Sequence, residues 1–225
     1  MSDRVRVWVI RTDADAATAE RFQALLDDNE RLHAADFLRE RDRLRYVVAH
    51  GARRLILGRE LAKAPESLSF HAAANGKPEL DGDEPHTSLA HDGGIALLAV
   101  AGRRPVGVDV RQLAEGLNPV DMSEQYFLPF EARYVAGGHD LLEQTDRYAR
   151  LWTRKEAAAK VAGGVGWANT RAAVLQRDLV ACVEPAAPTR HRVAPVAVPS
   201  GYRAAVALFG EAAFRVEVEE FEPAL

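Results

Sequence analysis

The order of apolar and polar residues at the start of the chain predicts a strand followed by helices. Val5, Val7 and Val9 alternate with charged or aromatic neighbours, which is the two-residue period of a strand with one buried face. The heavily charged stretches 13–26 and 30–41 are interpreted as helices. The chain is therefore expected to open with a strand that helices follow.

A strong amphipathic helix is predicted next. From Leu44 to Ala62, apolar residues recur at helical spacing until Pro65 stops the pattern. Gly51 and Gly58 lie on the same apolar face of this predicted helix. Because a glycine presents no side chain, both positions indicate close packing against another element.

The remaining residues alternate between turn-rich stretches and apolar runs of strand length. Residues 66–94 contain several glycine turns, and the prolines within 185–199 indicate a long loop. A helical region over 123–136, which a proline interrupts, precedes a long helix over 141–162 that Gly163-Gly164 is expected to end. The expected strands are 95–100, 106–110, 172–175, 179–183, 202–209 and 214–221.

Composition narrows the class of protein. A hydrophobic content of 48% with 28% charged residues is ordinary for a soluble globular protein, and a net charge of −4 argues against a general nucleic-acid binder. No stretch reaches the roughly 18 apolar residues of a membrane span. A single cysteine, Cys182, excludes an intramolecular disulfide and favours a reducing compartment. We expect a cytoplasmic protein without nucleic-acid or membrane partners.

One predicted helix and one predicted strand carry the residues best suited to catalysis. The segment from Trp152 to Lys160 is rich in Ala, Lys, Arg and Glu and contains neither Gly nor Pro. On a helix, Glu156 and Lys160 are i and i+4 and share a face with Trp152. Asp109 lies near the end of the apolar run 104–110. Two carboxylates from a strand and a distant helix form a minimal Mg²⁺ site for handling a diphosphate.

Each of these residues also has an ordinary structural interpretation. Asp109 can end a strand with local hydrogen bonds, and Glu156 can be a solvated helix residue. Lys160 can form an i,i+4 pair with Glu156, worth only about 0.3–0.5 kcal/mol. Taken one at a time, the residues leave these alternatives open.

As a set, the motifs resemble those of the Sfp-type 4′-phosphopantetheinyl transferases. The family's G-[IV]-D-x-x segment matches Gly107 to Arg111, and its W-x-x-K-E-[AS]-x-x-K helix matches Trp152 to Lys160, in the family's order and separation. Asn75 to Pro78 matches the family's G-K-P turn, and Leu89 to Gly93 matches its S-H-S segment. Each match is weak alone, whereas the ordered set is specific.

The resemblance implies a role for each matched residue. Asp109 and Glu156 would be the Mg²⁺ ligands, Glu156 would also help to deprotonate the incoming hydroxyl, and Lys160 would neutralise charge on the diphosphate. These three are the expected catalytic residues. Arg45 opens a helix where the family keeps an arginine that binds coenzyme A (CoA), and Arg53 follows two turns later. The expected binders of the CoA phosphates are Arg45, Arg53, Lys77, His91 and Lys160.

The resemblance also implies an α+β fold of two similar halves, packed as a pseudo-dimer with the active site between them. The boundary would fall near Gly102 to Pro105. Residues 1–103 would form the CoA-binding half and residues 104–225 the half with the metal-binding and catalytic residues. The sequence itself contains no convincing repeat between the halves.

The implied activity is a Mg²⁺-dependent transfer of the 4′-phosphopantetheine arm of CoA to a serine of an apo carrier protein. Adenosine 3′,5′-bisphosphate would be released. The partner would be an acyl or peptidyl carrier domain of a fatty-acid, polyketide or nonribosomal peptide synthase, and the enzyme is expected to be a monomer. Two alternatives remain: another Mg²⁺-dependent phosphohydrolase, or a non-catalytic module that binds CoA and carrier protein.

Three departures from the family pattern bear on the site. Many relatives have a second acid two residues after the aspartate, where this chain has Arg111. The serine before the motif histidine is Ala90, which removes one hydroxyl contact to CoA. Upstream lysines of some relatives are replaced near Glu30 and His33. The first departure puts the metal affinity in question.

Overall fold

The computed structural model describes residues 3–73, 76–82, 85–113, 116, 118–161, 172–182 and 189–222. Within them, the helices are α1 Ala16–Ala24, α2 Asp28–Ala35, α3 Glu40–Leu61, α4 Pro119–Tyr126, α5 Pro129–Ala136 and α6 Leu141–Val161, with a short 3₁₀ turn at Pro65–Ser67. The strands are β1 Asp3–Arg11, β2 Phe70–Ala72, β3 Pro78–Leu80, β4 His86–Asp92, β5 Ile95–Ala101, β6 Val106–Gln112, β7 Leu179–Cys182, β8 Thr189–Pro195, β9 Tyr202–Phe209 and β10 Phe214–Phe221.

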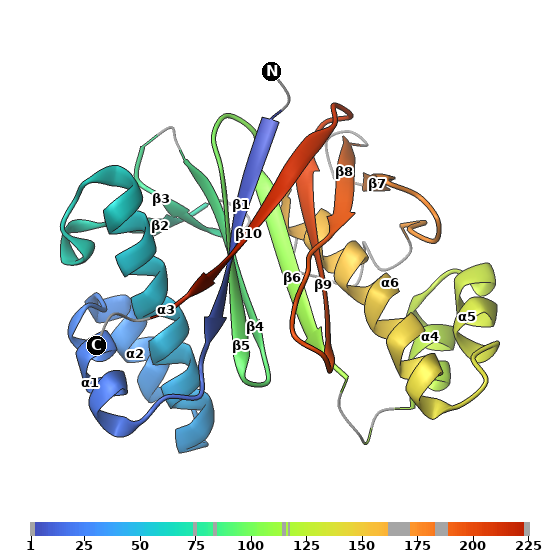
Figure 1. Ribbon diagram of the computed structural model, residues 1–225, viewed down its shortest axis with the longest axis horizontal. Coiled ribbons are helices and arrows are strands. Elements are labelled where there is room, and N and C mark those ends of the chain that lie inside the picture. The colour runs from blue at the N-terminus through green and yellow to red at the C-terminus, as the bar shows by residue number, and fades with distance from the viewer. Residues whose placement is uncertain are drawn as a thin grey trace.

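Two four-stranded sheets form the centre of this mixed α+β fold, and helices cover both outer faces (Figure 1). The first sheet has the order β10-β1-β5-β4 and the second β6-β9-β8-β7, while β2 and β3 form a small separate hairpin. All pairings in the large sheets are antiparallel except β1 with β10. The C-terminal strand β10 therefore belongs to the same sheet as the N-terminal strand β1.

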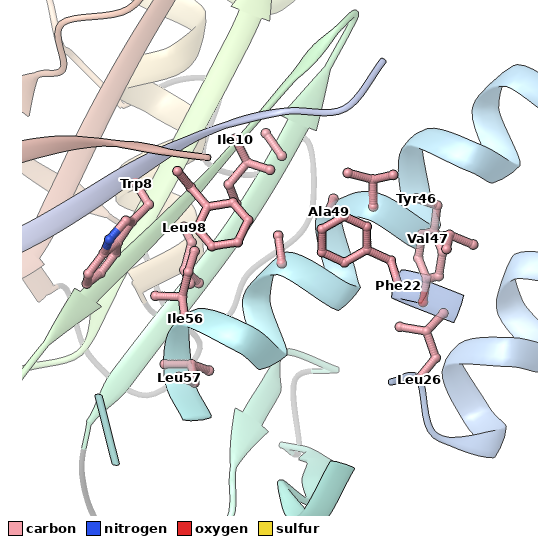
Figure 2. Close-up of a cluster of buried hydrophobic side chains, with 14 of the residues drawn as sticks. Trp8, Ile10, Phe22, Leu26, Tyr46, Val47, Ala49, Ile56, Leu57 and Leu98 are labelled. Carbon is pink, nitrogen blue, oxygen red and sulfur yellow. The ribbon is translucent and has the colours of Figure 1, made fainter. Parts of the chain in front are cut away.

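Strand β1 is buried on both faces from Val7 to Ile10, which corrects the expectation of one exposed face for that part of the strand, whereas Arg4 near its start is exposed. Val5, Val7 and Val9 join the hydrophobic core between the two sheets. Trp8 and Ile10 point the other way, into the core that the first sheet forms with α3 (Figure 2). The polar alternation failed as a guide because helices cover the face that was expected to meet water.

Helix α3 confirms the predicted amphipathic helix and the close packing at Gly51. A Cβ atom at Gly51 would lie 2.5 Å from Cδ1 of Phe22 in α1, so only glycine lets the two helices approach this closely. At Gly58 the nearest atom is the carbonyl oxygen of Lys63, in the turn that follows the helix. That turn passes through Ala62, which adopts the left-handed conformation at φ 51° just before Pro65.

Strand β6 and helix α6 also make a close backbone contact. A Cβ atom at Gly107 would overlap the carbonyl oxygen of Ala157 and lie 2.8 Å from the amide nitrogen of Val161. The glycine of the G-V-D segment therefore lets α6 lie directly on β6. This contact fixes the distance between α6 and the strand residues that follow Gly107.

The edges of the two sheets are linked where β4 meets β6. The amide of Val108 donates to Oγ of Ser88 at 3.1 Å, and the amide of Gln112 donates to Oδ2 of Asp92 at 2.9 Å. Along this edge, these backbone amides of β6 donate to side chains of β4 and not to its backbone, and these bonds join the two sheets. No helix among the described residues combines the length and apolarity that a membrane span requires.

Several elements differ from the sequence predictions. The turn-rich stretch 66–94 contains β2, β3 and β4, and the proline-rich loop contains β8. Residues 172–175 are not a strand. The expected helix end at Gly163-Gly164 lies outside the described residues, as does Asn75 of the expected turn.

We predict that Gly107→Ala lowers the free energy of unfolding by about 1–3 kcal/mol, because the added methyl group must displace the backbone of α6. Chemical denaturation measures this loss. Gly102→Ala is the matched control, since a Cβ atom there meets nothing within 4 Å. Equal stability of the two variants would contradict the close contact between β6 and α6.

Candidate active site

A ladder of side chains between β6 and α6 forms the candidate active site. Asp109 and Arg111 share one face of β6, since they are two residues apart on a strand. Asp109 pairs with Lys160 on the helix, and the guanidinium of Arg111 lies near the ring of Trp152, two helical turns before Lys160. Glu156 lies on the helix between these two positions. The expected catalytic residues therefore come together.

The shortest contact in this ladder joins Lys160 to Asp109. Nζ of Lys160 donates to Oδ1 of Asp109 at 2.6 Å, across an interval of 51 residues. Asp109 is only 8% exposed, whereas the side chain of Lys160 keeps 23% of its surface open. In place of the i,i+4 pair with Glu156 that the sequence suggested, the lysine thus reaches across to the strand.

Burial and mutual repulsion act on the two carboxylates. Burial raises the pKa of Asp109 above its ordinary value, although the charge and hydrogen bond of Lys160 oppose this. Burial also raises the pKa of Glu156, and the charge of Asp109 raises it further. Two carboxylates that repel each other in a partly buried site favour a cation between them. Their hard oxygen ligands are the type that Mg²⁺ prefers.

Arg111 lies beside this pair and adds positive charge. Its guanidinium carbon lies 5.9 Å from the ring centre of Trp152, and its Nε lies 3.7 Å from Oδ2 of Asp92. The charge of Arg111 partly opposes the rise that burial causes in the pKa of Asp109 and Glu156. Among the described residues, no group of three or more His, Cys, Asp or Glu side chains is arranged to hold a metal. The site therefore offers two carboxylates and two cations.

A cavity of about 670 Å³ opens next to the ladder. We call it the α3–α6 cavity, because α3 and β4 line it and Lys160 of α6 closes one side. Three of the expected CoA-binding residues, Arg53, Lys77 and His91, line it together with Lys160. The full lining is His33, Tyr46, His50, Arg53, Gly76, Lys77, Pro78, Thr87, Ser88, Leu89, His91 and Lys160.

Lys77 and His91 face this cavity from its β side. Nζ of Lys77 donates to the carbonyl oxygen of Val106 at 2.8 Å, which brings the G-K-P turn against β6. Burial lowers the pKa of Lys77, and it also lowers the pKa of His91, to which Lys160 adds repulsion. Both residues therefore lie in a partly dry environment next to the carboxylate ladder.

The two arginines of α3 that were expected to bind CoA differ in their surroundings. Arg45 lies on the more open part of the helix, where its Nε donates to Oδ1 of Asp13 at 2.8 Å. It is close enough to His91 to lower the pKa of that residue. Arg53 is 4% exposed, and its Nη2 donates to Oε1 of Glu30 at 2.5 Å. Arg45 is held by an exposed partner and Arg53 by a buried one.

The sequence reasoning missed an aromatic wall and its buried carboxylate. His50 stacks on Tyr46 at 3.9 Å between ring centres, and His33 tilts against Tyr46 at 5.0 Å. Glu30 accepts from Nδ1 of His50 at 3.2 Å when that nitrogen carries the proton. The i,i+4 spacing of Tyr46 and His50 and the capping spacing of Asp27 and Glu30 are the signals that could have identified them.

Comparison with known proteins agrees with this geometry. Residues 105–180 match the model of the 4′-phosphopantetheinyl transferase superfamily, a span that holds both β6 and α6. The chain is 31% identical over 169 residues to the 4′-phosphopantetheinyl transferase HetI of a Nostoc species, covering 72% of this chain and 70% of the relative.

Two further relatives carry the same name. A putative 4′-phosphopantetheinyl transferase of a Synechocystis species is 28% identical over 72% of this chain and 66% of its own length. A 4′-phosphopantetheinyl transferase of Bacillus subtilis is 26% identical over 66% of this chain and 65% of its own length. The matches thus span about two thirds of each relative. The chain belongs to the 4′-phosphopantetheinyl transferase superfamily.

Proposed function

We propose that the chain transfers the 4′-phosphopantetheine arm of CoA to a serine of an apo acyl or peptidyl carrier protein. The main support is the position of the Asp109–Glu156–Lys160 cluster at the edge of the α3–α6 cavity. The cavity offers cations for the phosphates, and the cluster offers carboxylates for a metal and a proton. A diphosphate that spans the two would meet both sets of groups.

Asp109 and Glu156 would hold Mg²⁺, since their oxygens suit this ion and it commonly keeps several waters of its own. When bound, the metal would neutralise diphosphate oxygens and stabilise the charge that develops on them. Arg111 would leave the shell with two side-chain ligands. In the structure Lys160 partly neutralises Asp109, so this lysine is free to turn towards the phosphates once another cation takes its place.

In the proposed reaction, the serine oxygen of the carrier attacks the β-phosphorus of CoA. A new phosphorus–oxygen bond forms, the bond to the bridging oxygen breaks, and adenosine 3′,5′-bisphosphate leaves with the electron pair. Glu156 takes the serine proton. Lys160 donates to the bridging oxygen as negative charge grows there.

The nucleotide part of CoA would occupy the α3–α6 cavity. Lys77 and His91 line it and would contact its phosphates, and Arg53 would contribute from the buried wall. Arg45 is outside the lining but near enough to affect the charge of His91, and it would contact a phosphate that extends beyond the cavity. The flat rings of Tyr46 and His50 give this wall an apolar surface beside the cations. Such a surface suits the combination of phosphate and ring that a nucleotide presents.

We further propose that the chain is a pseudo-dimer with halves 1–103 and 104–225. Helices α2 and α5 begin at residues 28 and 129, and α3 and α6 begin at 40 and 141, so both pairs are 101 residues apart. Strands β1, β5 and β4 are neighbours in one sheet, as β6, β9 and β8 are in the other. Strand β10 would belong to the second half in sequence but to the first half in space, since it pairs with β1 at the edge of the first sheet. The enzyme would act as a cytoplasmic monomer.

One incubation tests the proposed function. Wild-type chain, apo carrier protein, CoA and Mg²⁺ are combined, and intact-protein mass spectrometry follows the carrier. We expect the mass of one phosphopantetheine on the carrier and adenosine 3′,5′-bisphosphate in solution. Cleavage of CoA without modification of the carrier would instead identify a phosphohydrolase. Binding of CoA without any product would identify a non-catalytic module.

We predict that Asp109→Ala and Glu156→Ala each reduce transfer by about a hundredfold or more, because each removes one of two ligands for the metal. Circular dichroism should show an intact fold. Glu143→Gln on the same helix is the control, since Glu143 pairs only locally with Arg147. Near-normal transfer by either alanine variant at saturating Mg²⁺ would contradict the two-carboxylate site.

Lys160→Ala is predicted to lower kcat about tenfold or more, whereas Arg45→Ala and Lys77→Ala should mainly raise the KM for CoA. A group that helps only in the transition state changes turnover, and one that grips a distant phosphate changes binding. Steady-state kinetics with apo carrier in excess separate the two effects. An unchanged KM for CoA in Arg45→Ala would show that the nucleotide does not bind at that part of α3.

Arg111→Glu is predicted to lower the Mg²⁺ concentration that gives half-maximal rate, by about threefold or more, without changing the KM for CoA. Arg111 and Asp109 are i and i+2 on β6, so a carboxylate at 111 would face the same ion. Titrations of Mg²⁺ at saturating CoA, and of CoA at saturating Mg²⁺, measure both quantities. A raised KM for CoA with no gain in metal affinity would make Arg111 a phosphate contact.

A further inference from the structure

A buried glutamate fastens the long helix of the N-terminal half. Glu30 of α2 is 7% exposed and accepts from Nη2 of Arg53 at 2.5 Å and from Nε of Arg54 at 2.7 Å. Arg54 is fully buried, and its Nη1 also donates to the carbonyl oxygens of Pro65 at 3.2 Å and Leu68 at 2.8 Å. One carboxylate thus ties together α2, α3 and the turn that follows α3.

A second buried glutamate fastens the long helix of the C-terminal half in the same way. Glu131 of α5 is fully buried and accepts from Nζ of Lys155 at 2.7 Å. Lys155 is 1% exposed and also donates to the carbonyl oxygen of Ala172 at 2.5 Å. Oε1 of Glu131 accepts from the amides of Val174 at 2.7 Å and Leu175 at 3.1 Å. This carboxylate ties together α5, α6 and the segment 172–175.

The two arrangements occupy matching positions in the chain. Glu30 is the third residue of α2 and Glu131 is the third residue of α5. Glu30 and Glu131 are 101 residues apart, as are their partners Arg54 and Lys155. In both halves the cation lies on the long helix and also binds carbonyl groups beyond the end of that helix. The two arrangements share this chemistry although one cation is an arginine and the other a lysine.

Each arrangement lies directly behind one wall of the proposed active site. Glu30 holds Arg53 and contacts His50, and both of these line the α3–α6 cavity. Glu131 holds Lys155, which directly precedes Glu156 on α6 and points into the core, where its Nζ lies 4.9 Å from the ring centre of Phe127. Lys155 is therefore a motif residue that does not face the reacting groups.

We propose that Glu30 and Glu131 are matched positioning residues, Glu30 for the nucleotide-binding wall of α3 and Glu131 for the catalytic wall of α6. This inference rests on the proposed function. A buried ion pair with several hydrogen bonds fixes orientation where apolar packing would permit sliding, because its partners must stay within hydrogen-bond distance. Displacement of α3 would change how CoA is gripped, and displacement of α6 would move Glu156 and Lys160 relative to Asp109.

The matched variants Glu30→Gln and Glu131→Gln test this division. Each keeps the shape and an acceptor oxygen but removes the charge of the glutamate. In Glu30→Gln, Arg53 loses its charged partner, while Arg54 keeps its ion pair with Asp27 at 2.5 Å. Glu30→Gln should raise the KM and the Kd for CoA about fivefold or more with kcat within about twofold of wild type. Glu131→Gln should lower kcat about tenfold or more with the KM within about twofold, since small displacements of reacting groups are costly.

Controls and a second measurement separate positioning from loss of fold. Glu40→Gln and Glu143→Gln remove glutamates that pair locally with Arg43 and Arg147 in the first turns of α3 and α6, and both should keep wild-type kinetics. Amide hydrogen exchange at Val174 and Leu175 should quicken in Glu131→Gln but not in Glu30→Gln.

The same change in both kinetic constants for the two variants, or the reverse assignment, would overturn the inference. Amide exchange at Val174 and Leu175 that is as slow in Glu131→Gln as in the wild type would overturn it as well. If the wild-type chain binds CoA but transfers nothing, the proposed function fails. The Kd of Glu30→Gln and the exchange data then still decide whether the glutamates hold their walls.

Discussion

The backbone contact between β6 and α6 at Gly107 is the constraint on which the site depends. Any larger residue would force the helix away from the strand, because backbone atoms of α6 fill the space where a Cβ atom would lie. At this separation Lys160 reaches Asp109 at 2.6 Å, and Glu156 is near enough for the charge of Asp109 to raise its pKa. The glycine and the aspartate of the G-V-D segment therefore have linked roles, since the first sets the distance across which the second acts.

Electrostatics gives the two sides of the site different tasks. On the β6–α6 side, two partly buried carboxylates repel each other and are balanced by Lys160 and Arg111, an arrangement that a divalent cation would complete. On the α3 side, the charged residues that line the cavity are cations, and the buried carboxylate of Glu30 already pairs with Arg53 and Arg54. A ligand with several phosphates would be attracted to the second side and have its reacting phosphorus placed at the first.

Sequence patterns predicted the long helices and pointed to the candidate site residues, but they did not predict the surroundings of these residues. Helices α3 and α6 have many turns of periodic spacing, so their local pattern was sufficient. Strands β4 and β8 lie among glycine turns and prolines and are stabilised by neighbours distant in sequence, so local pattern missed them. The sequence marked Glu30 only as a departure from the family pattern and gave no sign of Glu131, because charged residues are expected at the surface and only the fold reveals their buried partners. The register that pairs Lys160 with Asp109 is likewise a property of tertiary packing.

Phosphorus NMR of bound CoA tests whether the diphosphate meets a metal at Asp109 and Glu156 while the rest of the nucleotide lies on the α3 wall. Mn²⁺ replaces Mg²⁺, and its paramagnetism broadens nearby phosphorus signals. In the wild-type chain, we expect strong broadening of the two diphosphate signals and much weaker broadening of the 3′-phosphate signal. In a variant that lacks both carboxylates, this difference should be lost. Equal broadening of all three signals, or a pattern that persists without the carboxylates, would contradict it.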